Sequence, residues 1–437
     1  MKFKLKKGMS LGALAAEKDE LLENVFVDLG HLEKLKNTSD PVFLIIGRTG
    51  SGKTALIKKL TGSVDNVSQL DPDELSMQYL QNSQILKTIS SWGVNLEIFY
   101  KYLWKHVCIL ELIRLRYGNE GDVPSKLKQM FDFTQIWKKE EKRAQEISQE
   151  YLQKYSSDYW IKADTRIKSI TNEIESKLTS DPTLSGKLGL AGSSIAATIG
   201  ASKMERAVDH VESEIVDRAQ NIVSDFQIAA LNRVIDSLEK YGFDDPQKHY
   251  YLVIDDLDKN WMPDDTLYLE LLKSLLYTVN ELNGKLRSVK IIVALRENIY
   301  HRVFQKASKH EPQREKWIDV SLKLTWTKED LIQLINARLF EMFRGEYTTK
   351  SPKLEDILPP RKKRSAEEAM DFMFDRTFMR PRDVIDFLNT CISNLESLTS
   401  MTWSVLTRQR KSFHNDDWTQ SLMNGKTAIL DCPCYFL

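Results

Sequence analysis

The sequence predicts an α/β protein with a parallel sheet and long helical regions. Short apolar runs that are followed by Gly, Asp or Arg indicate buried strands, because a strand covered on both faces is apolar throughout. Helical stretches separate these runs, which is typical of parallel strands joined by helices. The expected strands cover residues 42–46, 64–70, 250–254, 289–295 and 318–326.

The first apolar run leads directly into a glycine-rich segment and then into a helical stretch. The segment matches G-x-x-x-x-G-K-[ST] without a mismatch, in the order strand, loop and helix that this motif needs. Its glycines let backbone N–H groups approach phosphates closely, and the helix N-terminus adds favourable positive partial charge. We expect a nucleoside triphosphate here, with Lys53 on the β- and γ-phosphates and Thr54 on Mg²⁺. The nucleotide-binding residues are Gly47, Arg48, Thr49, Gly50, Ser51, Gly52, Lys53 and Thr54.

Two acidic residues follow the apolar run 250–254. We expect Asp255 to hold Mg²⁺ opposite Thr54, directly or through water. Asp256 is placed to orient or deprotonate the attacking water, which is the task of a general base. Asp258 is either a third acid in the site or the N-cap of the next helix.

Three arginines are candidates for contact with the nucleotide. Arg296 follows the apolar run 289–295, where it is expected to sense the γ-phosphate or to pair with the acids of residues 255–258. Arg380 and Arg382 flank a proline that can begin a helix. Their guanidinium groups are suited to bidentate phosphate binding, and an interdomain salt bridge is the alternative.

The pattern along the chain predicts five parts. They are a helical lead-in (1–38), a nucleotide-binding core (39–77 and 241–326), a large helical insertion (78–240), a helical lid (327–404) and an irregular tail (405–437). Residues 327–330, Thr-Lys-Glu-Asp, resemble a guanine-reading motif, but a capping box at the start of a helix is the preferred interpretation. His106 is expected to be packed or on the surface rather than a ligand.

Composition limits the function classes. Lys plus Arg and Asp plus Glu both number 62, so net charge predicts no partner. The four cysteines form no regular framework, and no apolar run approaches about 18 residues, so we expect a cytoplasmic protein without membrane contact. The charge-dense run 136–180 favours a solvated helix face over nucleic-acid contact. The small-residue segment 186–201 is a connection or, alternatively, a close-packed oligomer contact.

Several motifs together resemble bacterial P-loop ATPases that lie near the AAA+, STAND and KAP clades. The similarity is distributed over residues 10–395, and its most specific part is RTFMRPRD. The motifs are Ala15–Asp19, Gly47–Thr54, Val253–Trp261, Ala294–Asn298 and Arg376–Asp383. This resemblance implies an ASCE-type sheet with a helical insertion and a lid, ATP and Mg²⁺ as ligands, and lid arginines that contact the γ-phosphate.

Two function classes stay open. The first is an ATPase whose hydrolysis drives a switch in an antiviral or DNA-associated assembly, a context that only the resemblance implies. The second is a nucleotide-dependent scaffold with little turnover. In both, the helical insertion is expected to contact a second copy or a partner protein.

The tail over residues 405–437 has no clear apolar face. Members of the resembling group continue instead with a helix of the form FSQRRLxSxxxEW. With permitted codons, residues 408–432 can be re-read in a shifted frame as a segment of that kind. We therefore expect a frameshift in the gene, and a tail that is poorly packed and carries no function.

Overall fold

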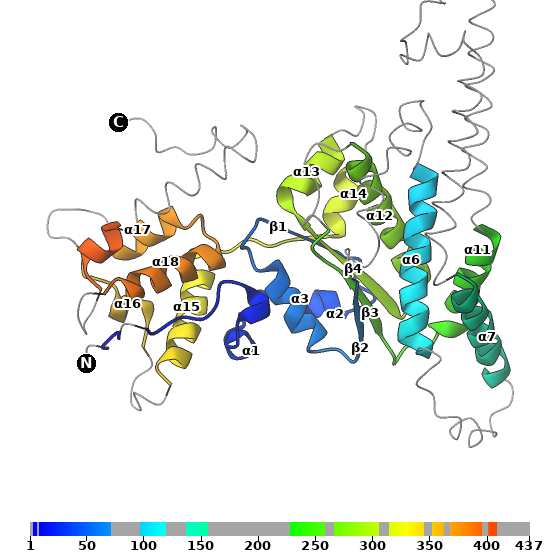
Figure 1. Cartoon of the computed structure of the whole chain (residues 1–437), viewed down its shortest axis with the longest axis horizontal. Coiled ribbons are helices and arrows are strands. Elements are labelled where there is room, and N and C mark those ends of the chain that lie inside the picture. Colours follow the sequence, from blue (N-terminus) through cyan, green and yellow to red (C-terminus); the bar gives the residue numbers. More distant parts are fainter. Residues whose placement is uncertain are drawn as a thin grey trace, which may run out of the picture. The chain divides into compact units, whose positions relative to one another are not determined.

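The structure of the chain is a computed structural model (Figure 1). The structure describes residues 3–6, 8–70, 97–118, 137–155, 228–257, 266–305, 314–344, 352–361, 368–395 and 401–408.

Five strands form one sheet in the order β2–β3–β4–β1–β5. The β2–β3 and β3–β4 pairs are parallel, with Ile254 opposite both Leu70 and Val293. All of β3 is buried, as is β4 up to its last residue, which fits a parallel sheet covered on both faces. The predicted α/β class with a parallel sheet is confirmed. The strands are β1 Leu44–Gly47, β2 Asn66–Leu70, β3 Tyr250–Ile254, β4 Val289–Arg296 and β5 Ser321–Lys323.

The chain divides into two compact units. The first contains Met1–Lys36, Ile45–Ser63 and Leu322–Leu437, and it is here called the P-loop unit because it contains the sequence motif of residues 47–54, here called the P-loop. The second, here called the central unit, contains Asn37–Leu44 and Val64–Ser321.

In the central unit, helices α6 (Glu97–Tyr117) and α12 (Thr266–Lys285) pack against each other. The Trp104 indole N–H of α6 donates to the Leu271 carbonyl of α12 at 3.0 Å. The Asn283 side chain ties α12 to β4, because it accepts from the Ile291 N–H at 2.7 Å and donates to the Ile291 carbonyl at 3.0 Å. The further helical elements are α7 Trp137–Tyr155, α11 Ile228–Ser237, η3 Leu238–Gly242, α13 Glu297–Gln305 and α14 Arg314–Asp319.

His106 of α6 is a packed residue, as one of the two expectations had it. Its ring is 1% exposed, and its Nδ1 lies 2.6 Å from the Tyr151 hydroxyl of α7. Burial lowers the pKa of His106 to about 3, so the ring stays neutral. Its Nδ1 can therefore accept a hydrogen bond from the Tyr151 hydroxyl.

The P-loop unit contains a helical domain whose core takes in the beginning of the chain. Helices α15, α17 and α18 form most of this core, and Phe3, Leu5 and Leu11 are buried in it. Figure 1 shows the helices of this domain grouped together. The helices of the unit are η1 Ala16–Lys18, α1 Leu22–Val25, α2 Leu32–Lys36, α3 Lys53–Thr61, α15 Lys328–Met342, α16 Leu354–Ile357, α17 Ala369–Arg376 and α18 Pro381–Ser393.

Some sequence expectations need correction. The expected strand over 318–326 was wrong in extent, since Ile318 is an exposed residue of α14 and β5 has only three residues. The lead-in is helical in short pieces only. The expected poor packing does not hold for the first residues of the tail, because residues 403–408 are helical and Val405 and Leu406 are buried.

Thr327 starts α15 as the preferred interpretation had it. Its hydroxyl accepts from the Asp330 N–H, and the Asp330 carboxylate accepts from the Thr327 N–H at 2.9 Å. These hydrogen bonds hold the pKa of Asp330 below its usual value. Residues 327–330 are therefore a capping box.

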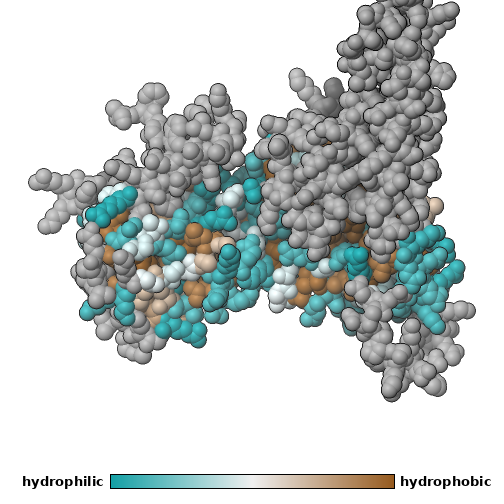
Figure 2. Space-filling view, in the orientation of Figure 1, coloured by the Kyte–Doolittle hydropathy of each residue, from teal (hydrophilic) through white to brown (hydrophobic). Residues whose placement is uncertain are grey.

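Other expectations fall wholly or largely outside the described residues: those for Asp258, for residues 186–201, for the tail after residue 408, for the charge-dense run after residue 155 and for the helical insertion beyond 97–118, 137–155 and 228–240. In the part of the chain that is described, no helix combines the length and apolarity needed to cross a membrane. On the face that Figure 2 shows, the hydrophobic residues of the described part of the chain lie among hydrophilic ones.

Candidate functional site

The glycine-rich loop joins a buried strand to a helix in the P-loop unit. β1 ends at Gly47, and α3 begins at Lys53 after Gly52, its N-cap. A Cβ at Gly47 would collide with the Ser51 hydroxyl, and Gly52 has φ +96°, where residues with a side chain are strained. The loop is therefore compact, and the Ser51 N–H donates within it to the Arg48 carbonyl at 3.1 Å.

The basic side chain of the loop lies back on the loop itself. The Lys53 ammonium donates to the Gly47 carbonyl at 3.0 Å and to the Arg48 carbonyl at 3.4 Å. Backbone carbonyls are weaker partners for an ammonium than phosphate oxygens, which carry full charge. Lys53 is thus held near the loop by contacts that a phosphate can replace. Thr54 follows in the first turn of α3.

The start of α18 contacts the same loop. The Arg382 backbone N–H donates to the Gly50 carbonyl at 3.3 Å. A Cβ at Gly50 would lie 3.0 Å from the Cβ of Arg382, so this arginine packs directly over the glycine. Arg380 donates from Nη1 to the Thr49 carbonyl at 3.4 Å. The structure therefore brings both predicted lid arginines to the P-loop.

The two arginines differ in what else they bind. Arg380 Nε lies 2.5 Å from Asp383 Oδ2, and both side chains are mostly buried. Arg382 is exposed, and within the described residues no hydrogen bond or ion pair of its guanidinium is recorded. Arg380 is thus engaged in an ion pair within its own helix start, while the Arg382 guanidinium is available to an anion at Gly50.

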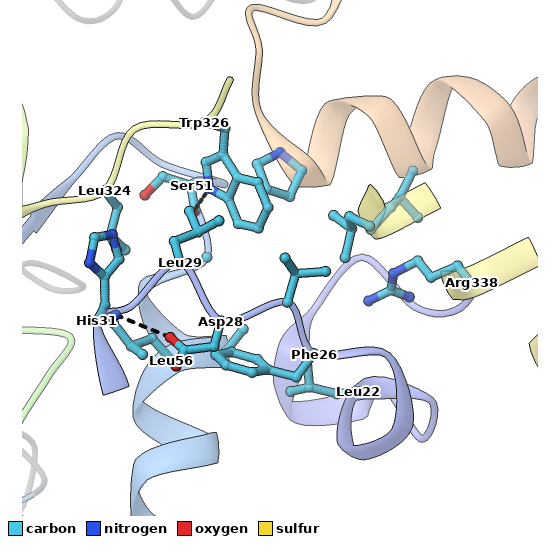
Figure 3. Close-up of a pocket in the computed structure, with 16 residues that line it drawn as sticks. Leu22, Phe26, Asp28, Leu29, His31, Ser51, Leu56, Leu324, Trp326 and Arg338 are labelled. Carbon is cyan, nitrogen blue, oxygen red and sulfur yellow. Dashed lines mark hydrogen bonds between the residues drawn. The ribbon is translucent and has the colours of Figure 1, made fainter. Parts of the chain in front are cut away.

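A pocket adjoins the loop on the side of α3 (Figure 3). It is partly open to solvent. Ser51 and Gly52 of the loop lie at one side, and Arg338 of α15 contributes from the helical domain. Its walls are mainly apolar, from Leu22, Phe26, Val27, Leu29, Ala55, Leu56, Leu324, Trp326, Leu334, Pro381 and Ile385.

A few polar groups line this pocket. Ser51 Oγ and Arg338 Nε are buried, and neither has a hydrogen-bond partner among the described residues. His31 is half-buried, and burial lowers its pKa, which favours the neutral ring with one donor and one acceptor. One Asp28 carboxylate oxygen accepts from the N–H groups of Gly30, His31 and Leu32 at 3.1 to 3.3 Å and so fixes the start of α2.

A buried ion pair holds the lead-in against the helical domain. Arg338 Nη2 lies 2.6 Å from Asp19 Oδ2, and its Nη1 donates to the Leu11 carbonyl at 2.6 Å. From α18, the Asn389 amide accepts from the Leu11 N–H at 2.7 Å and donates to the Gly12 carbonyl at 3.0 Å. Residues 10–19 are thereby fixed to α15 and α18, and α18 is the helix whose start contacts the glycine-rich loop.

In the central unit, β3 and β4 end side by side. The predicted site residues of this unit lie at these strand ends. Asp255 is 4% exposed, and its Oδ1 accepts from the Asp256 N–H at 2.8 Å. Asp256 has φ 57°, which is strained for a residue with a side chain. Arg296 is the last residue of β4. Since β3 and β4 are parallel neighbours, the acidic pair and Arg296 lie at the same edge.

Among the described residues, no group of three or more His, Cys, Asp or Glu could hold a metal ion. Mg²⁺ at a nucleotide needs no such cluster, because it is bound by one or two protein oxygens together with phosphates and water. Thr54 offers a hydroxyl oxygen and Asp255 a carboxylate oxygen, and both are donor types that bind Mg²⁺.

Comparison with known proteins finds one family. Residues 329–420 match the FunZ-associated C-terminal helical domain, and this range begins in α15 and extends beyond α18. The C-terminal helical domain of the structure is thus similar to that family. The search of curated proteins finds no match.

Sequence reasoning missed several residues of the pocket and its support. Trp326, Arg338 and Asn389 had drawn no attention, because each is a single residue in an ordinary helical or linking pattern. Asp19 was noticed only as part of a motif in the resemblance. A buried charge in an amphipathic helix, such as Arg338 among Leu334, Ile335 and Leu339, is the one signal that could have been used.

Proposed function

We propose that this protein binds ATP with Mg²⁺ at the P-loop and hydrolyses it. The observation that carries the proposal is that the glycine-rich loop and an apolar pocket adjoin at the N-terminus of α3. The N-terminus of α3 faces a glycine-rich loop with Lys53, and a mainly apolar pocket opens beside it. A nucleotide needs this combination, because its phosphates require N–H groups and cations while its base requires an apolar wall.

The phosphates would be bound by the loop backbone and by Lys53. Gly47 and Gly52 keep side chains out of the space in which a phosphate approaches the backbone. On binding, Lys53 would exchange the Gly47 and Arg48 carbonyls for the β- and γ-phosphate oxygens.

The base would enter the pocket between the lead-in and the helical domain. Phe26, Leu29 and Trp326 offer flat or apolar surface, which suits an aromatic heterocycle. Ser51 Oγ, Arg338 Nε and the neutral His31 ring are the polar groups that the base edge could meet. Few polar groups in an apolar pocket are typical of sites that orient one ligand.

Hydrolysis would use the edge where β3 and β4 end. When bound, Mg²⁺ would neutralise phosphate charge between Thr54 and Asp255. Asp256 would orient the attacking water and accept its proton, and Arg296 would contact the γ-phosphate. The strand order supports this assignment, because β4 separates the P-loop strand β1 from the acidic strand β3 as an ASCE-type sheet requires.

Arg382 is the lid arginine that we assign to the γ-phosphate. It lies over Gly50 with its guanidinium uncommitted among the described residues, whereas Arg380 is paired with Asp383. A guanidinium that gains a charged partner only when ATP is present makes the lid respond to the nucleotide state.

The biological role that fits this chemistry is a nucleotide-driven switch in the cytoplasm. The resemblance to P-loop ATPases near the AAA+, STAND and KAP clades favours an antiviral or DNA-associated assembly. In this proposal the helical insertion supplies the contact with a second copy or a partner protein. A scaffold that binds ATP with little turnover is the second candidate, favoured because the sequence of the helical insertion has no recognisable catalytic motif.

A phosphate-release assay separates the two candidates. The purified chain is given Mg²⁺ and ATP, with and without DNA, and Lys53→Ala is run in parallel. The ATPase proposal expects steady phosphate release that Lys53→Ala abolishes, and DNA stimulation would point to a DNA-associated assembly. Tight ATP binding without turnover would favour the scaffold, and equal turnover in Lys53→Ala would contradict the site.

A further inference from the structure

Trp326 lies between two fixed points of the P-loop unit. Just before it, the Leu324 N–H donates to the Ile46 carbonyl of β1 at 2.8 Å. Just after it, Thr327 caps α15 with two reciprocal hydrogen bonds. The short segment from Leu324 to Thr327 is therefore held at both ends. The fold thus sets the direction of the Trp326 indole.

The indole contacts the P-loop in two ways. Its Nε1–H donates to the Ser51 carbonyl at 2.8 Å, the dashed contact in Figure 3. Its ring also lies beside Gly52, where a Cβ would be 3.7 Å from the ring atom Cζ2. The same ring lines the apolar pocket. One side chain thus contacts the P-loop and forms part of the pocket wall.

The hydrogen bond determines the orientation of a peptide that matters for phosphate binding. A trans peptide is planar, so its C=O and the following N–H point in opposite directions. When Trp326 holds the Ser51 carbonyl on the pocket side, the Gly52 N–H is aimed away from the pocket. Gly52 is the N-cap of α3, and its N–H belongs to the loop that faces the phosphates.

We propose that Trp326 is a positioning residue that couples the base pocket to the phosphate loop. This inference rests on the proposed nucleotide site. The indole N–H orients the Ser51–Gly52 peptide for phosphate, while the ring supplies wall for the base. Occupation of the pocket holds the ring in place and thereby strengthens the loop's grip on phosphate, so that base and phosphates bind cooperatively through one side chain.

Trp326→Phe tests the hydrogen bond separately from the ring. The variant keeps an aromatic wall and loses the N–H donor, so ATP affinity should fall about 3- to 10-fold, the value of one hydrogen bond. Adenosine, which lacks phosphates, should bind as tightly as to the wild type. Trp326→Ala should weaken both ligands, because the wall is lost as well.

Trp403→Phe is the matched control. The Trp403 indole also donates to a backbone carbonyl at 2.8 Å, that of Pro360, in the same unit, but it does not line the pocket. Losing this bond should lower the melting temperature about as much as Trp326→Phe does and leave ATP affinity unchanged. This comparison distinguishes positioning of the loop from general loss of stability.

The experiment measures dissociation constants of Mg²⁺-ATP and adenosine for the wild type and the three variants, together with melting temperatures. Should Trp326→Phe not fold, Trp326→Leu takes its place, because it keeps an apolar wall without a hydrogen-bond donor, and ATP affinity should then fall more than adenosine affinity. Wild-type ATP affinity in the ring variant, or an equal loss in Trp403→Phe, would overturn the inference alone. A wild type that binds neither ligand would overturn the proposed function itself.

Discussion

The ends of strands β1 and β3 solve the same problem in different ways. Each must place polar atoms at the edge of a buried sheet. β1 is followed by a glycine-rich loop in which Gly52 takes φ +96° without a side chain to clash. β3 is followed by Asp256, which takes φ 57° although it has a side chain. After β1, a glycine adopts positive φ without strain. After β3, an aspartate adopts positive φ and is strained.

This difference indicates what each end is selected to do. Glycines let a loop approach a ligand with its backbone, so the side chains contribute little beyond Lys53. A strained aspartate costs about 1–3 kcal/mol and is retained only where the position of its carboxylate matters. Asp255 supports this geometry, since its carboxylate accepts the Asp256 N–H at 2.8 Å. This difference fits the proposed function, in which the β1 end binds phosphate through its backbone and the β3 end acts through its side chains.

The largest expected effect comes from Asp256→Asn. The amide can hydrogen-bond but cannot accept a proton, so phosphate release should fall by about 10²- to 10⁴-fold while ATP binding persists. Phosphate release and equilibrium ATP binding are measured on the same sample. If binding is lost instead, the roles of Asp255 and Asp256 are exchanged and the comparison needs revision.

Arg382→Ala should have the next largest effect. Loss of a guanidinium that binds phosphate should lower phosphate release about 10- to 100-fold, the range of a charge-assisted hydrogen bond, with little change in melting temperature. Arg380→Ala is the matched control, and it should reduce melting temperature more than activity because it breaks the ion pair with Asp383. The reverse ordering of the two variants would contradict our assignment.

Two substitutions test the backbone contrast directly, with opposite expected signs. Gly52→Ala puts a side chain at φ +96° and should lower the free energy of unfolding by about 1–2 kcal/mol. Asp256→Gly removes the side chain at φ 57° and should leave that free energy unchanged or raise it by up to about 1 kcal/mol. Denaturant titrations measure both. A clear loss of stability in Asp256→Gly would show that the aspartate is structural rather than strained.

The smallest effect concerns acid. The pKa of His106 is lowered from 6.5 to about 3, so the unfolded chain binds a proton more readily than the folded one between these pH values. The free energy of unfolding should therefore fall with decreasing pH in this window, by at most about 1.4 kcal/mol per pH unit. His106→Asn should reduce the slope. An unchanged slope in His106→Asn would contradict the neutral, buried ring.

Much of the fold could be predicted from local patterns. The runs 42–46, 250–254 and 289–295 became β1, β3 and β4 within two residues, because buried parallel strands are apolar throughout. The capping box at Thr327 was also recognised, since its hydrogen bonds depend only on residues 327–330. Local chemistry determines such features.

Features that depend on distant residues were missed. The strand expected over 318–326 is mostly helix and linker, because Leu324 pairs with Ile46 and little else of the run joins the sheet. The pairing of Arg338 with Asp19 joins residues 319 positions apart, and the Trp326 contact with Ser51 joins residues 275 apart. No local spacing marks these contacts, so the pocket beside the P-loop became visible only in three dimensions.

For the same reason, Arg380 and Arg382 could not be distinguished from the sequence. Their sequence environment is nearly symmetrical around Pro381, and both were equal candidates. Only the contact of Asp383 with Arg380 and the position of Arg382 over Gly50 distinguish them.

The central claim is tested most directly by calorimetric titration of Mg²⁺-ATP into the wild type, Lys53→Ala and Lys59→Ala. Lys59 lies on the same helix, and its ion pair with Glu23 is at the surface, so its removal controls for charge alone. The account predicts that the wild type and Lys59→Ala bind one ATP per chain with similar affinity and that Lys53→Ala shows no measurable binding. Equal binding in Lys53→Ala, or no binding in the wild type, would contradict it.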